Sequence, residues 1–303
     1  MNVIEKLATY EDQISPGVSA CVGCNVELTL RTCMKVLGPN TIFAVPPGCM
    51  GGVGVVGWDK ESGAKTPVFF PLLDNVASML AGIKMHYERI GRKVNVVAFA
   101  GDGASVDAGM QCLSGAAERG DKIIYICYDN EGYMNTGYQR SGSTTKGAWT
   151  STTPVINGHG GKKQNKKDLT EIMAAHNIPY VAQTTFLGNF KDFHEKAHRA
   201  IYTEGPAFVN VMSPCPRGWQ YPTEMLPEIC KMAVETCVWP LYEIIDGEWH
   251  LNYMPKKKLP VEEFMKLQGR FKHCFKPGNE WTIEAAQQYV DEKWEKLLAR
   301  CGK

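Results

Sequence analysis

The fold of this chain is decided by the stretch VNVVAFAGDGASVDAGMQCLSGAAERGDKIIYICYDN, residues 94–130. It contains two short, predominantly apolar runs, 94–100 and 123–129, and a helical pattern between them that closes at Gly120. Apolar strands joined by a helix are typical of a parallel sheet that is covered on both faces. The sequence therefore predicts an α/β fold, with a mostly parallel sheet and helices on both of its faces.

The same alternation continues on both sides of this stretch. Helices are expected at 25–37, 72–91, 168–177 and 189–202, and strands at 41–45, 180–185 and 207–212. In parallel sheets, ligands bind in the loops that follow the carboxyl ends of the strands. Three such loops carry the candidate chemistry: the glycine-rich loop 46–60, the GDG turn 101–103 and the polar stretch 130–154.

The character of the chain changes after about residue 220. We expect residues 1–220 to form the α/β domain, and residues 221–303 to form an extension that packs on that domain or on partner subunits. Asp246-Gly247 lies between two apolar stretches and predicts a hairpin with a type I′ turn. Residues 282–302 have the pattern of an amphipathic helix.

The composition argues against several classes of protein. The 303 residues include 33 basic and 32 acidic side chains, for a formal net charge of +1. No bulk attraction to nucleic acid or to an anionic membrane is therefore expected. No apolar run approaches the ~20 residues of a membrane-spanning helix, and the first residues lack the layout of a secretory signal. We expect a cytoplasmic protein without nucleic acid or membrane among its partners.

Four of the eleven cysteines stand in settings that suit metal binding. Cys21 and Cys24 form a CxxC motif, Cys49 lies in PPGCMGG, and Cys215 lies in SPCPRGW after an expected strand. Glycine and proline keep the backbone irregular there, so that amide N–H groups can turn toward sulfur. Four thiolates complete either a zinc site or a [4Fe–4S] cluster, and the spacing does not choose between them. The remaining cysteines are expected to be small buried apolar residues; they are Cys33, Cys112, Cys127, Cys230, Cys237, Cys274 and Cys301.

The GDG turn and the next strand end carry a second candidate site. One strand delivers Asp102 into a glycine turn, and the next strand delivers Asn130. Together they offer hard oxygen ligands to a small divalent cation that keeps a diphosphate as another ligand. Glycines let the backbone approach the phosphates closely. This arrangement resembles the fingerprint of thiamine diphosphate enzymes.

A series of motifs extends this likeness along the chain. They are CVGCNVEL (21–28), GPNT (38–41), GC (48–49), FAGDG (99–103), YDNEGYMNTGYQRS (128–141) and SPCPRGW (213–219). In order and spacing they resemble the β subunit of the pyruvate:ferredoxin oxidoreductase family, from about Ser15 to Trp219. The resemblance implies the thiamine diphosphate-binding fold, with thiamine diphosphate, Mg²⁺ and one nearby [4Fe–4S] cluster.

The resemblance also implies roles for individual residues. The matching positions are Cys21, Cys24, Cys49 and Cys215 for the cluster, Asp102, Asn130 and the Gly132 carbonyl for Mg²⁺, and Gly101, Gly103, Ala104 and Cys49 for thiamine diphosphate. Asn135 matches an asparagine beside the thiazolium ring and the substrate, which makes it a candidate cofactor contact and catalytic residue. Arg140 is a second catalytic candidate, as the partner of a substrate carboxylate; its alternative is a loop-surface position or a contact with a partner chain.

The reaction implied is the oxidative decarboxylation of a small, pyruvate-like 2-oxoacid, with coenzyme A as the acyl acceptor and ferredoxin as the electron acceptor. The chain has one diphosphate-binding pattern, which implies that it supplies half of a thiamine diphosphate site. The expected partners are therefore a subunit that binds the pyrimidine ring and the substrate and, from the resemblance, a ferredoxin-like subunit. Oxalate oxidation without coenzyme A is the first alternative, and 2-oxoisovalerate is a less favoured substrate. Two alternatives of other classes are a zinc or iron–sulfur structural subunit that binds no thiamine, and a non-redox thiamine decarboxylase.

Two features depart from the family pattern. The family usually has a glutamate two residues after the second cysteine, whereas Val26 stands there and Glu27 follows on a different helical face. The cofactor contact of that glutamate cannot be carried over. The loop 46–60 is rich in glycine and valine where the family has larger polar or aromatic residues, and in the resemblance this loop lies near the substrate.

Overall fold

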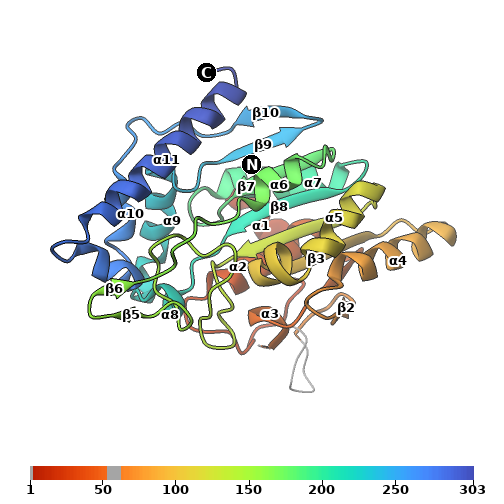
Figure 1. The fold of residues 1–303 in the computed structure, drawn as a ribbon. Helices are drawn as coiled ribbons and strands as arrows, with labels where there is room; N and C mark the ends of the chain where they lie inside the picture. The colour runs from red at the N-terminus through yellow and green to blue at the C-terminus, as the bar shows by residue number, and fades with distance from the viewer. Residues whose placement is uncertain (1–2, 53–62) are drawn as a thin grey trace.

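A central eight-stranded sheet organises the computed structural model of the chain, which describes residues 3–52 and 63–303. The strands lie in the order β10 (Glu248–Leu251), β9 (Tyr242–Ile245), β7 (Tyr180–Thr184), β8 (Ala207–Met212), β4 (Ile124–Asp129), β3 (Asn95–Gly101), β1 (Thr41–Ala44) and β2 (Val68–Phe69) (Figure 1). From β2 to β7 the neighbours are parallel, and β9 and β10 are antiparallel. The predicted α/β fold class is confirmed.

Helices lie on both faces of this sheet (Figure 1). The α-helices are α1 (Val3–Thr9), α2 (Asn25–Leu37), α3 (Cys49–Gly52), α4 (Val76–Arg89), α5 (Met110–Arg119), α6 (Leu169–Ala174), α7 (Phe190–Tyr202), α8 (Pro216–Trp219), α9 (Leu226–Glu235), α10 (Val261–Met265) and α11 (Glu280–Arg300). Shorter elements are the π-helical turn η1 (Gly103–Ala108), the 3₁₀ turns η2 (Thr223–Met225) and η3 (Gly269–Phe275), and the strand pair β5 (Val155–Ile156) and β6 (His159–Gly160). Helix α2 has the predicted bounds.

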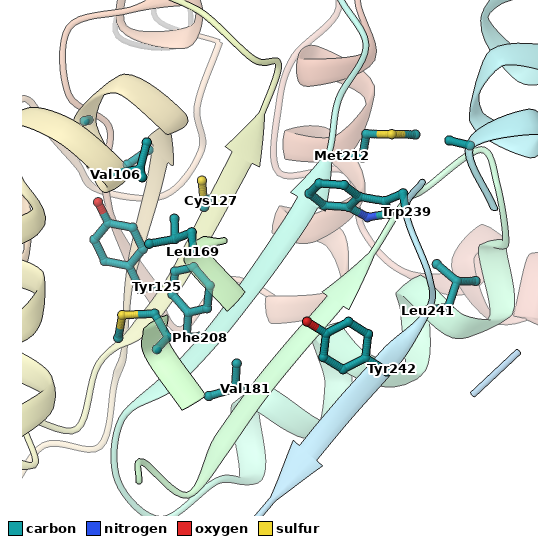
Figure 2. Close-up of a cluster of buried hydrophobic side chains, with 14 of the residues drawn as sticks. Val106, Tyr125, Cys127, Leu169, Val181, Phe208, Met212, Trp239, Leu241 and Tyr242 are labelled. Carbon is teal, nitrogen blue, oxygen red and sulfur yellow. The ribbon is translucent and has the colours of Figure 1, made fainter. Parts of the chain in front are cut away.

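Alternate residues of the central strands point to opposite faces of the sheet and build two cores. In β4, Tyr125 and Cys127 belong to one core, and Ile124 and Ile126 belong to the other. Figure 2 shows part of the first core, in which side chains from β4, β8, β7 and β9 lie over the same face. Helices α4, α5, α6, α9 and α11 contribute to this core, whereas α2 and α7 contribute to the second.

The hairpin that follows residue 220 belongs to the central sheet. Its turn residues Asp246 and Gly247 have φ angles of 50° and 88°, as the predicted type I′ turn requires. Strand β9 pairs with β7, so the C-terminal segment extends the sheet of the preceding residues. The division of the chain into a domain 1–220 and an extension 221–303 stays a prediction.

The segment after the GDG turn differs from the single helix that was predicted. The π-helical turn η1 comes first, where the N–H of Gly109 donates to the carbonyl of Ala104 at 2.9 Å, and the regular helix α5 begins at Met110. Such π-helical turns are rare and often occur at functional sites. The glycine-rich loop is described as far as Gly52, and residues 53–60 lie outside the described residues. None of the helices in the described part of the chain has the length and apolarity that crossing a bilayer requires.

Candidate cofactor and metal site

The sheet brings four candidate residues to the carboxyl ends of its central strands. Strands β8, β4, β3 and β1 are parallel neighbours, so their carboxyl ends lie side by side. The chain continues from β1 to Cys49, from β3 to Asp102, from β4 to Asn130 and from β8 to Cys215. Parallel sheets bind their ligands at this end of their strands.

A cavity of about 120 Å³ lies at the carboxyl ends of these strands. Seven of the predicted cofactor or metal positions line it: Cys49, Gly101, Gly103, Ala104, Asn130, Gly132 and Asn135. Tyr128, Tyr133 and Met134 contribute larger side chains to its wall. Arg140 does not belong to the described lining; its side chain is exposed, and its backbone N–H donates to Thr152 Oγ1 at 3.0 Å.

The predicted Mg²⁺ ligands converge on the amide of Asn130. One end of this amide lies 2.9 Å from Asp102 Oδ1 and 2.8 Å from the carbonyl oxygen of Gly132. With nitrogen at that end, the amide donates to both oxygens. With oxygen there, three oxygens face one another and the nitrogen lies 3.9 Å from Cys49 Sγ. Oxygens ~2.9 Å apart form an edge of the octahedron that Mg²⁺ occupies at metal–oxygen distances of ~2.1 Å, so this donor set fits a magnesium ion.

The carboxylate of Asp102 is buried close to another acid. Burial, and then the negative charge of Asp129, raise the pKa of Asp102 well above its ordinary value, although a hydrogen bond from Ser141 opposes the shift. A divalent cation beside this carboxylate would favour its ionised form. The electrostatics of the turn therefore suit a bound metal ion.

The glycine at position 103 is required by close packing. A β-carbon there would lie 2.4 Å from Cε1 of Tyr133. The hydroxyl of Tyr133 has two acceptors within reach of its one hydrogen, the Gly103 carbonyl at 3.2 Å and Asp107 Oδ2 at 3.4 Å, and this keeps the ring over the turn. Because Tyr133 also lines the cavity, a side chain at position 103 would disturb the cavity wall.

The predicted cluster thiols form one group. In every pairing of Cys21, Cys24, Cys49 and Cys215, the negative charge of one thiolate raises the pKa of another, so these side chains lie within range of one another's charge. Within residues 3–52 and 63–303, no three His, Cys, Asp or Glu side chains already stand at metal-binding separation. The fold thus brings the four thiols near one another without placing them in a finished coordination geometry.

The surroundings of these thiols disfavour a bare thiolate. Burial raises the pKa of Cys24 to about 11, and it also raises the pKa of Cys49 and of Cys215. At Cys215, hydrogen bonds from the backbone of Gly218 and Arg217 oppose this effect, and the Gly218 nitrogen lies 3.3 Å from Sγ. A coordinated metal deprotonates its thiol ligands outright, so a metal centre would supply the positive charge that this setting needs.

Charged side chains that no sequence pattern marks as a group meet behind the turn that follows β4. The carboxylate of Glu131 accepts hydrogen bonds from Arg270 at 2.7 Å and from Lys166 at 3.2 Å. Although burial opposes the shift, Lys166 and Arg270 lower the pKa of Glu131 to about 2. Lys166 belongs to the basic run KKQNKK (162–167), a pattern typical of solvated surface, and no local signal marks Arg270.

Val26, at the position where the pyruvate:ferredoxin oxidoreductase family usually has a glutamate, is a core residue in this chain. Val26 is 2% exposed and packs in the second core. Glu27 forms an ion pair with Arg31, one turn further along α2, at 2.9 Å. Neither side chain belongs to the described lining of the cavity.

Sequence comparison identifies the family. Residues 56–211 match the family described as thiamine pyrophosphate enzyme, C-terminal TPP binding domain. Pyruvate synthase subunit PorB of Methanocaldococcus jannaschii is 41% identical over 295 residues, which cover 95% of this chain and 97% of that protein. The chain belongs to the β-subunit family of the 2-oxoacid:ferredoxin oxidoreductases. The predicted resemblance is therefore confirmed.

Another relative and a solved structure are also similar to this chain. The β subunit of NADH-dependent phenylglyoxylate dehydrogenase from Aromatoleum evansii is 44% identical over 275 residues, and the match covers 90% of this chain and 61% of that relative. The 2-oxoglutarate:ferredoxin oxidoreductase of Magnetococcus marinus has a TM-score of 0.57 at 20% identity, over 74% of this chain and 80% of that chain. At this identity the likeness shows a shared fold.

Proposed function

We propose that this chain is the thiamine diphosphate-binding subunit of an enzyme that oxidatively decarboxylates a small, pyruvate-like 2-oxoacid. The observation that carries the proposal is the position of Cys49. This thiol lines the cavity that contains the predicted cofactor contacts, and it also belongs to the group of four cysteines. A redox centre on these thiols would therefore adjoin the cofactor, as electron transfer between them requires.

Residues of the strand ends would hold the diphosphate through a metal ion. Asp102, Asn130 and the Gly132 carbonyl are the proposed Mg²⁺ ligands, and the turn from Gly101 to Ala104 would contact the phosphates. When bound, thiamine diphosphate supplies an electron sink for the loss of CO₂ from a 2-oxoacid. The carboxylate of Asp102 would offset part of the charge of the cation, and the missing side chain at Gly103 leaves room for the Tyr133 ring.

The four thiolates would hold one [4Fe–4S] cluster, which supplies an acceptor of single electrons beside the cofactor. The N–H of Gly218, directed at Cys215 Sγ, withdraws negative charge from the sulfur and would tune the reduction potential. Zinc on the same thiols has no redox chemistry. The two metals therefore lead to different functions for the chain.

Asn135 and Arg140 are the proposed contacts to the substrate. Asn135 is exposed at the cavity wall, where its amide can orient a bound acid. Arg140 is also exposed but stands outside the described lining, so its proposed contact with a carboxylate requires a site that extends beyond this cavity.

We further propose that partner subunits complete the site. The cavity is smaller than the roughly 300–1,000 Å³ of ordinary ligand sites, and the exposed apolar side chains of Phe69, Phe70 and Leu72 precede Leu73 in its wall. Apolar surface beside a site suits a protein interface. The proposed partners are a pyrimidine-binding, substrate-binding subunit and a ferredoxin-like subunit that passes electrons to ferredoxin, with coenzyme A as the acyl acceptor.

The test uses the complete complex, purified without oxygen. Pyruvate should bleach the visible absorbance of the cluster when Mg²⁺ and thiamine diphosphate are present, and should not when the cofactor is removed. Bleaching by oxalate without coenzyme A, together with no response to pyruvate, would replace the substrate by the alternative. Stoichiometric zinc in place of iron would refute the redox role of this chain.

A further inference from the structure

The residue between two of the proposed Mg²⁺ ligands is anchored away from the cavity. Glu131 follows Asn130 and precedes Gly132, and its φ angle is 63°, in the left-handed region that side chains other than glycine seldom adopt. Its carboxylate is buried, and it accepts hydrogen bonds from Arg270, Lys166 and Thr145. Surrounding structure has to hold a residue in this conformation, and here the buried carboxylate is the part that is held.

Arg270 supplies the closest of these contacts. It comes from η3 in the C-terminal segment, it is 1% exposed, and its Nη1 lies 2.7 Å from Glu131 Oε2. Its Nε donates to Gln268 Oε1 at 2.8 Å, and its carbonyl accepts from the Trp149 N–H at 2.9 Å, so the guanidinium approaches the turn from a fixed backbone.

The same guanidinium contacts a second connection to the turn. It stacks on the ring of Trp219 at 3.7 Å from the ring centre, and Trp219 Nε1 donates to the Asn130 carbonyl at 2.8 Å. Trp219 ends α8, and the N-cap of this short helix is Cys215, the proposed cluster ligand. Arg270 therefore contacts both the residue that anchors the turn and the segment that carries a proposed cluster thiol.

We propose that Arg270 is a positioning residue: through its ion pair with Glu131 and its stacking on Trp219, it holds Asn130 and Gly132 in the geometry that binds Mg²⁺ and keeps this turn in register with Cys215. The inference rests on the proposed thiamine diphosphate and Mg²⁺ site. It assigns a role to the C-terminal segment, which contributes no residue to the described lining of the cavity.

A general role in stability makes a different prediction from a role in positioning. The fold contains a second buried ion pair, Lys196 with Asp192 at 2.7 Å, within α7 on the second core. Loss of that pair should lower the melting temperature and leave Mg²⁺ binding unchanged. The double variant Lys196→Met/Asp192→Asn is therefore the matched control for loss of the Arg270–Glu131 pair.

The experiment measures Mg²⁺-dependent thiamine diphosphate binding by calorimetry in the assembled complex, together with iron content and melting temperature. Arg270→Gln should weaken binding about 10–100-fold, the loss typical when a group that supports a metal ligand is removed. Arg270→Lys keeps the charge and should recover part of this loss. The double variant Arg270→Gln/Glu131→Gln should lose less affinity than the sum of the losses of the two single variants, because the two residues share one ion pair.

Three results separate the hypotheses. A wild-type complex that binds no thiamine diphosphate would overturn the proposed function, and the role of Arg270 with it. A wild-type complex that binds, with an Arg270→Gln complex that binds within twofold of it, would overturn the role of Arg270 alone. The same holds if the α7 control weakens binding as much as Arg270→Gln does. If Arg270→Gln fails to assemble, Glu131→Gln and Arg270→Lys decide: wild-type affinity in both refutes the inference, and weaker binding in both supports it.

Discussion

Replacement of Gly103 by alanine probes the turn that is proposed to contact the diphosphate. The new β-carbon would lie 2.4 Å from Tyr133 Cε1, whereas ordinary van der Waals contact begins at 3.4 Å. The ring must therefore withdraw by about 1 Å in a closely packed site. Its hydroxyl would then lose good geometry toward the Gly103 carbonyl and Asp107.

The direction in which the Tyr133 ring moves decides whether the stability of the fold or the affinity for thiamine diphosphate falls. Overpacking of a tight site costs about 1–3 kcal/mol. If Tyr133 moves away from the cavity, this cost lowers the free energy of unfolding, and the melting temperature falls by about 2–4 °C for each kcal/mol. If Tyr133 moves into the cavity, the same cost opposes cofactor binding, and the affinity for thiamine diphosphate falls by about 5–150-fold.

Thermal melting and titration with thiamine diphosphate at fixed Mg²⁺ measure the two effects in the assembled complex. Gly82→Ala is the control, because a β-carbon at Gly82 in α4 meets no atom within 4 Å. This change should leave the affinity unaltered and raise stability by about 0.4–1 kcal/mol. In a Tyr133→Ala background, Gly103→Ala should cost less than about 0.5 kcal/mol, because the ring is gone. Wild-type melting and affinity in Gly103→Ala would refute the packing argument.

Four further predictions follow from the same structure. Asp102→Ala should weaken Mg²⁺-dependent thiamine diphosphate binding about 10–100-fold with unchanged iron content; full occupancy at limiting Mg²⁺ would contradict it. Cys215→Ser should abolish or alter the EPR signal of the proposed cluster in this chain, whereas Cys112→Ser should not. Burial, and then the charge of His198, lower the pKa of His194 in the folded chain. The imidazole of His194 therefore binds a proton more tightly in the unfolded chain, and the free energy of unfolding should fall as the pH drops below about 6.5. The urea midpoint of His194→Gln should fall less than that of wild type between pH 8 and pH 5.5, and an equal fall would exclude His194 as the cause. The chain without partner subunits should show no 2-oxoacid-dependent dye reduction, and turnover by the chain alone would disprove a shared site.

Several parts of the site could be predicted because their signals are local. The runs that became β3 and β4 are apolar from Val96 to Ala100 and from Ile124 to Tyr128, and Asp102 and Asn130 directly follow the ends of these strands. Since the carboxyl ends of neighbouring parallel strands lie side by side, two such strand ends in a sequence predict a shared site. The bounds of α2 were predictable for a similar reason, because Gly38 (φ 75°) ends the helix where a residue with a positive φ angle is needed.

Other parts could not be predicted because they depend on distant partners. The sequence predicts the hairpin around Asp246-Gly247, but the pairing of β9 with β7 joins residues 242–245 to residues 180–183. An isolated hairpin pattern contains no information about which sheet edge it will meet. The π-helical turn after the GDG motif was also missed, because its residues have an ordinary helical pattern.

The sequence by itself determined the fold class, the kinds of ligand atom and the strand ends that present them, since apolar runs, glycine turns and cysteine settings are properties of neighbouring residues. Only the tertiary structure decided which charged side chains are buried and paired. Lys166 looks like part of a solvated basic run, yet it meets Asp129 and Glu131 behind the turn. Arg270 meets Glu131 from 139 residues away. A buried charge is stable only where its desolvation is offset by a partner at close range, and in this chain the fold alone brings those partners together.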